Sequence, residues 1–198
     1  MKPANWWMPE TQQQAFRAVL DGFARPGTRV AVQGAAPAGD AVLMFLSAVL
    51  DESVSLADPL GLLGADARRL LLAPTAPVAQ ARFVLLDGRR AADASWQPSL
   101  GTLESPEQGA TLVLTVDGLG DVGATPASGD TVLRLQGPGV PGVRTLAVSG
   151  LDRSWLQQRA AWGAAFPLGV DLVLAAPEAL VALPRTTRVE IVSHGEEA

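Results

Sequence analysis

The stretch VDLVLAAPEALVALPRTTRVEIV, residues 170–192, holds apolar runs of the length and composition of β-strands. The run VDLVLAA (170–176) predicts one strand, and residues 179–192 have room for one or two more. The polar group PRTT (184–187) interrupts the second run. This end of the chain therefore predicts adjacent strands of a sheet.

The rest of the chain predicts helices and strands that alternate early, with strands dominating the middle. Helices are expected after Pro9 as far as Pro26-Gly27, and over 39–51, 66–73 and 152–166. Strands are expected over 28–34, 53–58, 82–88, 110–119, 131–136 and 143–150, with an irregular connection over 87–109. This order predicts one α/β domain over residues 1–198, a mixed β-sheet flanked by helices.

The first helix is expected to be amphipathic. Phe16, Val19, Leu20 and Phe23 recur at helical spacing and form one apolar stripe, and Thr11 is the expected N-cap. Trp6-Trp7 precede this helix and are costly to leave in water. We expect the two indoles to pack on the core of this chain or on another chain.

The segment GPGVPG (137–142) has the spelling of a dinucleotide-binding loop, G-x-G-x-x-G. Such a loop must open a helix, but the residues that follow, 143–150, have the pattern of a strand. Pro138 and Pro141 also have no N–H to offer a phosphate. The segment is therefore interpreted as a turn between two strands.

Composition excludes several classes of protein. Of the 198 residues 48% are hydrophobic, the mean hydropathy is +0.22 and the formal net charge is −5, which argues against disorder and against a broad nucleic-acid surface. The longest apolar run, 41–50, is too short for a membrane span, and cytoplasmic is the expected location. The chain has no Cys and no Tyr, its single His is His194 and its single Lys is Lys2. This shortage of acid–base and nucleophilic groups favours a binding or assembly subunit over a stand-alone enzyme.

A few polar groups are candidates for contacts with an anion or with another subunit. Arg185 with Thr186 and Thr187 can bind an oxyanion, fix an interface, or form a turn held by the Thr hydroxyls, and these alternatives stay open. Arg89 and Arg90 follow a predicted strand and can meet a phosphate. The acidic residues at 104, 107, 117, 121 and 130 have no spacing that fits a calcium loop or a catalytic pair, and no catalytic, cofactor-binding or metal-ligating residue is assigned.

The run FPLGVDLVLAAPEALVALPRTTRVE (166–190) resembles the C-terminal signature of the PhnH family, subunits of the bacterial carbon–phosphorus lyase system. FRAVLDGFARPG (16–27), SPEQGATLVL (105–114) and RLQGPGVPG (134–142) are similar to the same family, in the same order along the chain.

The resemblance implies a homodimer that works with PhnG, PhnI, PhnJ and PhnL in phosphonate breakdown. With PhnG, PhnI and PhnL it would couple an alkylphosphonate to ATP, giving a ribose 1-alkylphosphonate 5-triphosphate. The implied fold is that of the large domain of pyridoxal-phosphate-dependent transferases. The only lysine, Lys2, lies outside every predicted core element, so no pyridoxal phosphate site and no cofactor are expected.

Two hypotheses of different class follow. The first is a non-catalytic, dimeric assembly subunit of the carbon–phosphorus lyase machinery. The second is a small-molecule binder with a pocket for a phosphorylated ligand, in which Arg185, Thr186 and Thr187, together with Arg89 and Arg90, are the anion contacts. A transferase that uses a carboxylate base is a third and weaker alternative.

Overall fold

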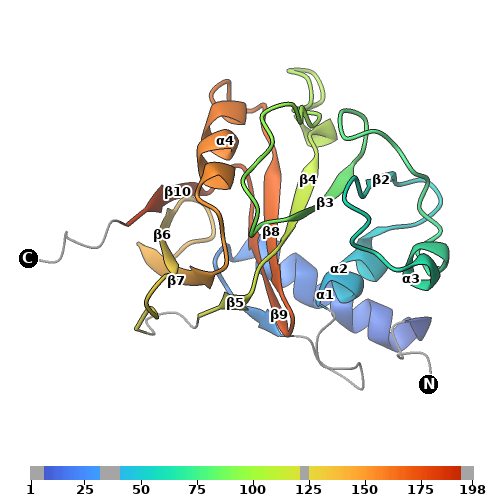
Figure 1. Cartoon of the computed structure of the whole chain (residues 1–198), viewed down its shortest axis with the longest axis horizontal. Coiled ribbons are helices and arrows are strands. Elements are labelled where there is room, and N and C mark those ends of the chain that lie inside the picture. The colour runs from blue at the N-terminus through green and yellow to red at the C-terminus, as the bar shows by residue number, and fades with distance from the viewer. Residues whose placement is uncertain (1–6, 32–40, 121–124, 193–198) are drawn as a thin grey trace, which may run out of the picture.

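The strands form two sheets in the computed structural model, which describes residues 7–31, 41–120 and 125–192 (Figure 1). The larger sheet has six strands in the order β1-β9-β8-β4-β3-β2. The neighbours β2, β3, β4 and β8 run parallel, whereas β8–β9 and β9–β1 are antiparallel, so the predicted mixed sheet is confirmed. The bounds are β1 (Val30–Ala31), β2 (Leu56–Ala57), β3 (Phe83–Asp87), β4 (Thr111–Thr115), β8 (Asp171–Ala176) and β9 (Ala179–Leu183).

The central strands are apolar on both faces, and this pattern sets their register. In β4, Leu112 and Leu114 face one hydrophobic cluster while Val113 faces the other. Leu114 lies opposite Leu86 of β3 and Leu174 of β8, so side chains of one face continue from strand to strand. Strands that are buried on both faces have continuous apolar sequences, and this is why the sequence pattern identified them.

Two helices cover one face of the larger sheet. They are α1 (Pro9–Ala24) and α2 (Ala41–Val49), which lie together on the same side (Figure 1). The buried Phe45 of α2 meets the ring of Phe83 edge to face, with the ring centroids 5.8 Å apart. Together with Val19 of α1 and Val113 of β4 they belong to one core cluster.

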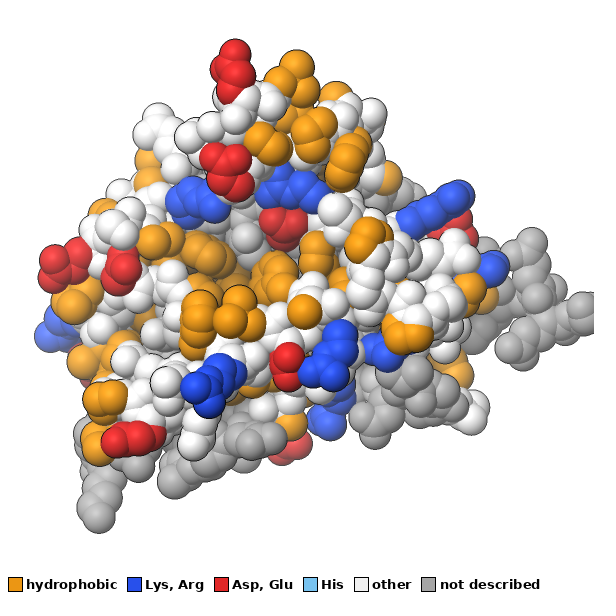
Figure 2. Space-filling view, turned by 180° about the vertical axis from the view of Figure 1, so that it is seen from behind, with side chains coloured by type: hydrophobic (Ala, Val, Ile, Leu, Met, Phe, Trp, Pro, Cys, Tyr) orange, Lys and Arg blue, Asp and Glu red, His pale blue; other side chains and the backbone are white. Residues whose placement is uncertain are grey.

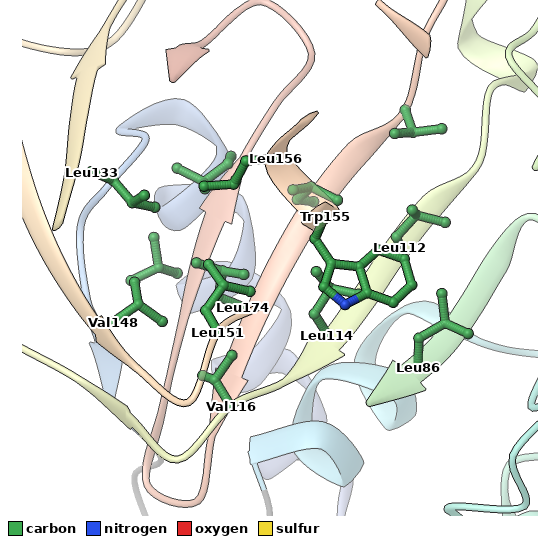
Figure 3. Close-up of a cluster of buried hydrophobic side chains, with 14 of the residues drawn as sticks. Leu86, Leu112, Leu114, Val116, Leu133, Val148, Leu151, Trp155, Leu156 and Leu174 are labelled. Carbon is green, nitrogen blue, oxygen red and sulfur yellow. The ribbon is translucent and has the colours of Figure 1, made fainter. Parts of the chain in front are cut away.

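The other face packs against a second sheet and α4 (Ser154–Trp162). The second sheet is antiparallel in the order β10-β6-β7-β5, with β5 (Gly118–Leu119), β6 (Thr131–Gln136), β7 (Arg144–Ser149) and β10 (Arg188–Ile191). Trp155 of α4 is 1% exposed, stacks on Trp96 and donates from its indole to the carbonyl of Arg90. Figure 3 shows Trp155 beside Leu112 and Leu114 of the larger sheet, with Leu133 of the smaller sheet in the same cluster.

Two expectations for the first helix were wrong in detail. The helix begins at Pro9 with Met8 as N-cap and no capping side chain, so Thr11 lies inside it. Proline suits this position because its missing N–H has no intrahelical partner there. The apolar stripe is also not buried as a whole, because Phe16 is 45% and Leu20 is 52% exposed.

The expected strand 110–119 is divided between the two sheets. β4 ends at Thr115, and the chain then leaves the larger sheet so that β5 can pair with β7. The expected helix over 66–73 is also shorter: α3 (Ala65–Leu70) ends before Leu72, whose φ is +56°. The apolar run alone did not show where the chain changes direction.

Figure 2 shows the molecule from behind, with hydrophobic side chains gathered in a central hollow and charged groups around it.

None of the helices in the described ranges is long and apolar enough to cross a membrane.

The packing of the core predicts a large effect at β4. Replacing Leu114 with Ala should lower the free energy of unfolding by about 2–5 kcal/mol, because the side chain is fully buried and its removal leaves a cavity. Urea denaturation of the purified chain measures this. The matched control is Leu103→Ala, at a leucine that is 75% exposed, which should change stability by less than about 0.5 kcal/mol; equal effects would contradict the packing described.

Candidate functional site

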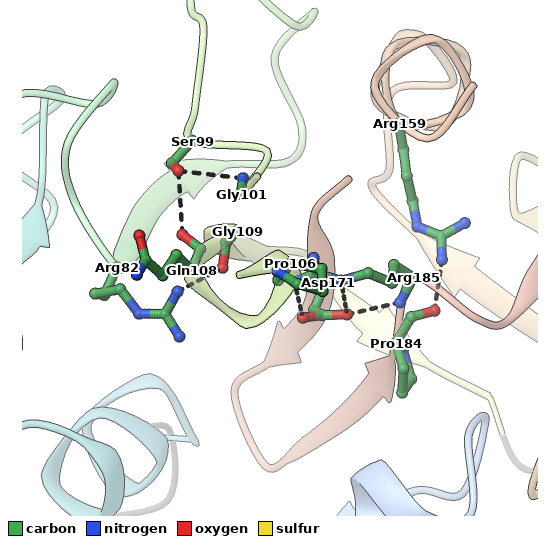
Figure 4. A network of polar contacts seen from close by, with 10 residues as sticks. All are labelled: Arg82, Ser99, Gly101, Pro106, Gln108, Gly109, Arg159, Asp171, Pro184 and Arg185. Carbon is green, nitrogen blue, oxygen red and sulfur yellow. Dashed lines mark hydrogen bonds and ion pairs between the residues drawn. The ribbon is translucent and has the colours of Figure 1, made fainter. Parts of the chain in front are cut away.

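The PRTT group forms the turn between β9 and β10, and Arg185 is held there by an ion pair (Figure 4). The Asp171 carboxylate, at the start of β8, accepts from the backbone N–H of Arg185 at 2.6 Å and from Nη2 at 2.8 Å. Nη1 of Arg185 donates to the carbonyl of Pro106 at 2.6 Å. Both side chains are largely buried, with 13% of Arg185 and 20% of Asp171 exposed.

A second arginine holds the same turn from α4. Nη2 of Arg159 donates to the carbonyls of Pro184 at 2.7 Å and Thr187 at 3.0 Å. Burial lowers the pKa of the Arg159 guanidinium, and the nearby Asp171 carboxylate acts in the opposite direction. Thr187 is 1% exposed and its hydroxyl has no hydrogen-bond partner, so arginines rather than Thr hydroxyls fix the turn.

Glycines let two more segments approach this turn closely. A Cβ on Gly109 would lie 2.6 Å from Nη1 of Arg185 and 2.5 Å from the carbonyl oxygen of Gly169. A Cβ on Gly137 would lie 2.7 Å from the carbonyl oxygen of Thr186, and Gly137 has φ +134°. The GPGVPG segment is thus the β6–β7 turn, as predicted, and it packs against the PRTT turn.

Arg89 and Arg90 lie at the opposite edge of the sheet. They follow the carboxyl end of β3, whereas Asp171 begins β8 and β3 and β8 run in the same direction. Arg89 donates to Asp87 at 2.7 Å and lies 3.6 Å from Asp117. The structure therefore does not bring the two predicted groups of anion contacts into one site.

The Asp87–Arg89 pair perturbs both ionisable groups. The hydrogen bond from the Arg89 side chain lowers the pKa of the Asp87 carboxyl. The same hydrogen bond, with the charge of Asp87, raises the pKa of Arg89. Both groups are therefore charged at neutral pH and serve as a fixed ion pair.

A cavity of about 330 Å³ opens beside this pair, at the carboxyl ends of β4 and β8. Ligands of open α/β sheets bind at this edge of the sheet. The lining residues combine one cation, two carboxylates and a tight backbone turn: Arg29, Asp117, Gly118, Leu119, Ala176, Pro177, Glu178 and Ala179.

Comparison with known proteins shows the family. The family described as "Bacterial phosphonate metabolism protein (PhnH)" matches residues 3–190. The chain belongs to the PhnH family.

Two curated relatives cover nearly the same span. A protein of Stutzerimonas stutzeri that carries the name C-P lyase subunit protein HtxG is 42% identical over 190 residues, 95% of this chain and 91% of the relative. A protein of Rhizobium meliloti (strain 1021), named alpha-D-ribose 1-methylphosphonate 5-triphosphate synthase subunit PhnH, is 33% identical over 187 residues, 90% of each chain.

The chemistry available to this PhnH-family chain is narrow in the part that the structure describes. There, no three His, Cys, Asp or Glu side chains gather as metal ligands. The single lysine, Lys2, and the single histidine, His194, both lie outside the described residues. Residues 7–31, 41–120 and 125–192 thus offer no lysine for a Schiff base, and they do not fit pyridoxal phosphate.

Sequence reasoning found Arg185 but not its partners. The signal for Asp171 was a carboxylate at the start of an otherwise apolar strand, which needs a cation once it is buried. Arg159 shares a helix face with the buried Trp155, which lies four residues earlier. The available clue in each segment was a single charged residue, Asp171 in DLVLAA and Arg159 in SWLQQRAAW, beside side chains that become buried.

The ion pair predicts a measurable loss of stability. Asp171→Asn should lower the free energy of unfolding by about 3 kcal/mol, because it leaves the largely buried guanidinium of Arg185 without its counter-charge. Arg188→Gln is the control, since Arg188 is 73% exposed in its pair with Glu190, and the expected loss is below about 1 kcal/mol. Equal, small losses in both variants would show that the Asp171–Arg185 pair does not hold the turn.

Proposed function

We propose that this chain is a non-catalytic subunit of a carbon–phosphorus lyase assembly. In this proposal it acts with PhnG, PhnI and PhnL to form ribose 1-alkylphosphonate 5-triphosphate from ATP and an alkylphosphonate, and it also contacts PhnJ. The single observation that carries the proposal is the family match over residues 3–190, with curated relatives named as subunits of this machinery.

The geometry agrees with a role in assembly. The PRTT group, part of the stretch that resembles the family signature, is used inside the chain, since Arg185 bonds to Asp171 and to a backbone carbonyl. Asp87 and Arg89 at the other edge neutralise one another. Arg159 and Arg185 thus fix the turn that joins the two sheets and α4, and a surface held rigid in this way suits contact with other subunits.

The proposal extends to the state of the isolated chain. We expect a homodimer in the cytoplasm, with the fold of a pyridoxal-phosphate-dependent transferase large domain from which the cofactor site is missing. The mixed sheet with helices on one face supports this fold. Fold alone does not fix chemistry, so such a domain can serve as a binding surface.

Reconstitution tests the proposed role. Purified chain given ATP and methylphosphonate should release no adenine, whereas a mixture with PhnG, PhnI and PhnL should release it, and omission of this chain should reduce the rate at least tenfold. Chromatography of the released base measures the reaction. Adenine release by the chain alone, or an unchanged rate when it is omitted, would contradict the proposal.

A second candidate function is binding of a phosphorylated small molecule, and the cavity next to Arg89 favours it. The cation in the lining of this cavity is Arg29, and Arg89 and Arg90 would contact the anion from beside it, since Arg89 reaches the lining residue Asp117 and Arg90 is exposed. Of Arg185, Thr186 and Thr187 at the other edge, the exposed Thr186 would contribute a separate contact, whereas Arg185 is paired with Asp171 and Thr187 is buried.

Calorimetry separates this function from pure assembly. If the chain binds ATP or methylphosphonate at this cavity, Arg29→Ala, which removes the cation of its lining, should weaken binding at least fivefold, while Arg188→Ala, at an exposed arginine of β10, should leave it unchanged. No heat at millimolar ligand, or equal effects of both variants, would count against the binding function.

A further inference from the structure

An apolar groove lies between α1, the end of α2 and the end of α3. Its volume is about 520 Å³. It is lined on one side by the first turns of α1 and on the other by three consecutive leucines, and the lining residues are Trp7, Gln12, Gln13, Phe16, Ser47, Ala48, Leu50, Asp51, Glu52, Leu70, Leu71 and Leu72. The half-buried Trp7, one of the two early tryptophans, belongs to this lining.

The groove is bordered by large apolar side chains that face solvent. Phe16 is 45% exposed, Leu70 48% and Leu72 63%. Leu71, between the two exposed leucines, is buried and anchors the segment in the core. Single exposed leucines are ordinary, but several around one hollow mark an interaction site.

The backbone at Leu72 adds an independent observation. Leu72 follows the end of α3 with φ +56°, a left-handed conformation that glycine adopts readily and leucine does not. Of the residues in the described ranges, it is the one non-glycine residue with positive φ. The chain thus exposes a leucine side chain to solvent at a position where the backbone favours glycine.

The charged residues of the groove indicate the charge that a partner should carry. The charged lining residues are Asp51 and Glu52, and both are acidic and exposed. A partner with a basic surface would complement these carboxylates, whereas a second copy of this chain, with a formal net charge of −5, would not. A segment with apolar side chains and flanking Lys or Arg would pack against the leucines and form ion pairs with the carboxylates.

We propose that this groove binds an amphipathic, basic helix of a different subunit in the carbon–phosphorus lyase assembly. A helix laid in a groove presents apolar residues at i, i+3, i+4 and i+7, which suits a hollow bordered by Phe16 and the leucines of 70–72. Basic residues beside that stripe would meet Asp51 and Glu52. This inference rests on the proposed function, because it assigns a surface to the proposed assembly.

Photo-crosslinking in the assembled complex tests the contact. Benzoylphenylalanine replaces Leu72 in one sample and Leu103 in the control, and each chain is co-expressed with PhnG, PhnI, PhnJ and PhnL and irradiated after purification. Leu103 is the matched control because it is 75% exposed and lies outside the groove. We expect the Leu72 sample to cross-link to a peptide of another subunit that has a helical apolar stripe with Lys or Arg, and the Leu103 sample not to reach that peptide.

Each other outcome overturns the inference. A cross-link to a second copy of this chain, or to an acidic peptide, would show a different occupant. Co-purification without any cross-link from position 72 would show that the groove is free in the complex while the proposed function stands. A chain that does not co-purify at all would instead remove the proposed function, and this inference with it.

A substitution distinguishes docking from folding. Leu72→Gly removes the exposed side chain and relieves the positive φ, so the melting temperature should not fall while affinity for the partner subunits falls roughly tenfold, as for an interface anchor. Leu103→Gly should leave this affinity unchanged. Glu52→Lys should weaken binding and Glu52→Gln should weaken it less. Full affinity in Leu72→Gly would overturn the proposal.

Discussion

The ion pair between Asp171 and Arg185 is the contact on which the arrangement of this molecule depends. It links the amino end of β8 to the turn that follows β9. Arg185 also reaches the 3-10 helix η2 (Pro106–Gln108), just before β4, through the carbonyl of Pro106. The turn after β9 is therefore joined through Arg185 to the start of β8 and to the 3-10 helix that precedes β4.

The same turn connects the larger sheet to the rest of the fold. Arg159 of α4 donates to two backbone carbonyls of the turn. The β6–β7 turn packs closely against Thr186 because Gly137 has no Cβ there. The chain continues from this turn into β10, which completes the smaller sheet beside β6. Three of the segments that resemble the family, 105–114, 134–142 and 166–190, meet at this turn.

The sequence predicted the strands well because the central ones are buried on both faces. The runs that became β3, β4 and β8 are continuous and apolar, as is typical of strands covered on both sides. The strands of the smaller sheet were predicted, but not that they form a separate sheet, because the pattern over 110–119 does not show that the chain changes sheets after Thr115. Pairing of Asp171 with Arg185 was missed because it joins residues of separate segments, and local spacing carries no such information.

The groove shows a different limit of pattern reading. The apolar stripe of α1 identified a helix but could not tell which of its residues face the sheet and which face a partner. Val19 packs inside, whereas Phe16 and Leu20 stay at the surface. The helical spacing is the same for both groups of residues, so only the packed structure separates them.

Hydrogen exchange of the Asp171→Asn variant tests most directly whether one ion pair joins these segments. We expect amides of the β8–β9 hairpin, of residues 99–109 and of the turn at 137–142 to lose protection together relative to the original chain. Local loosening near position 171 alone, with full protection at 137–142, would contradict a shared junction.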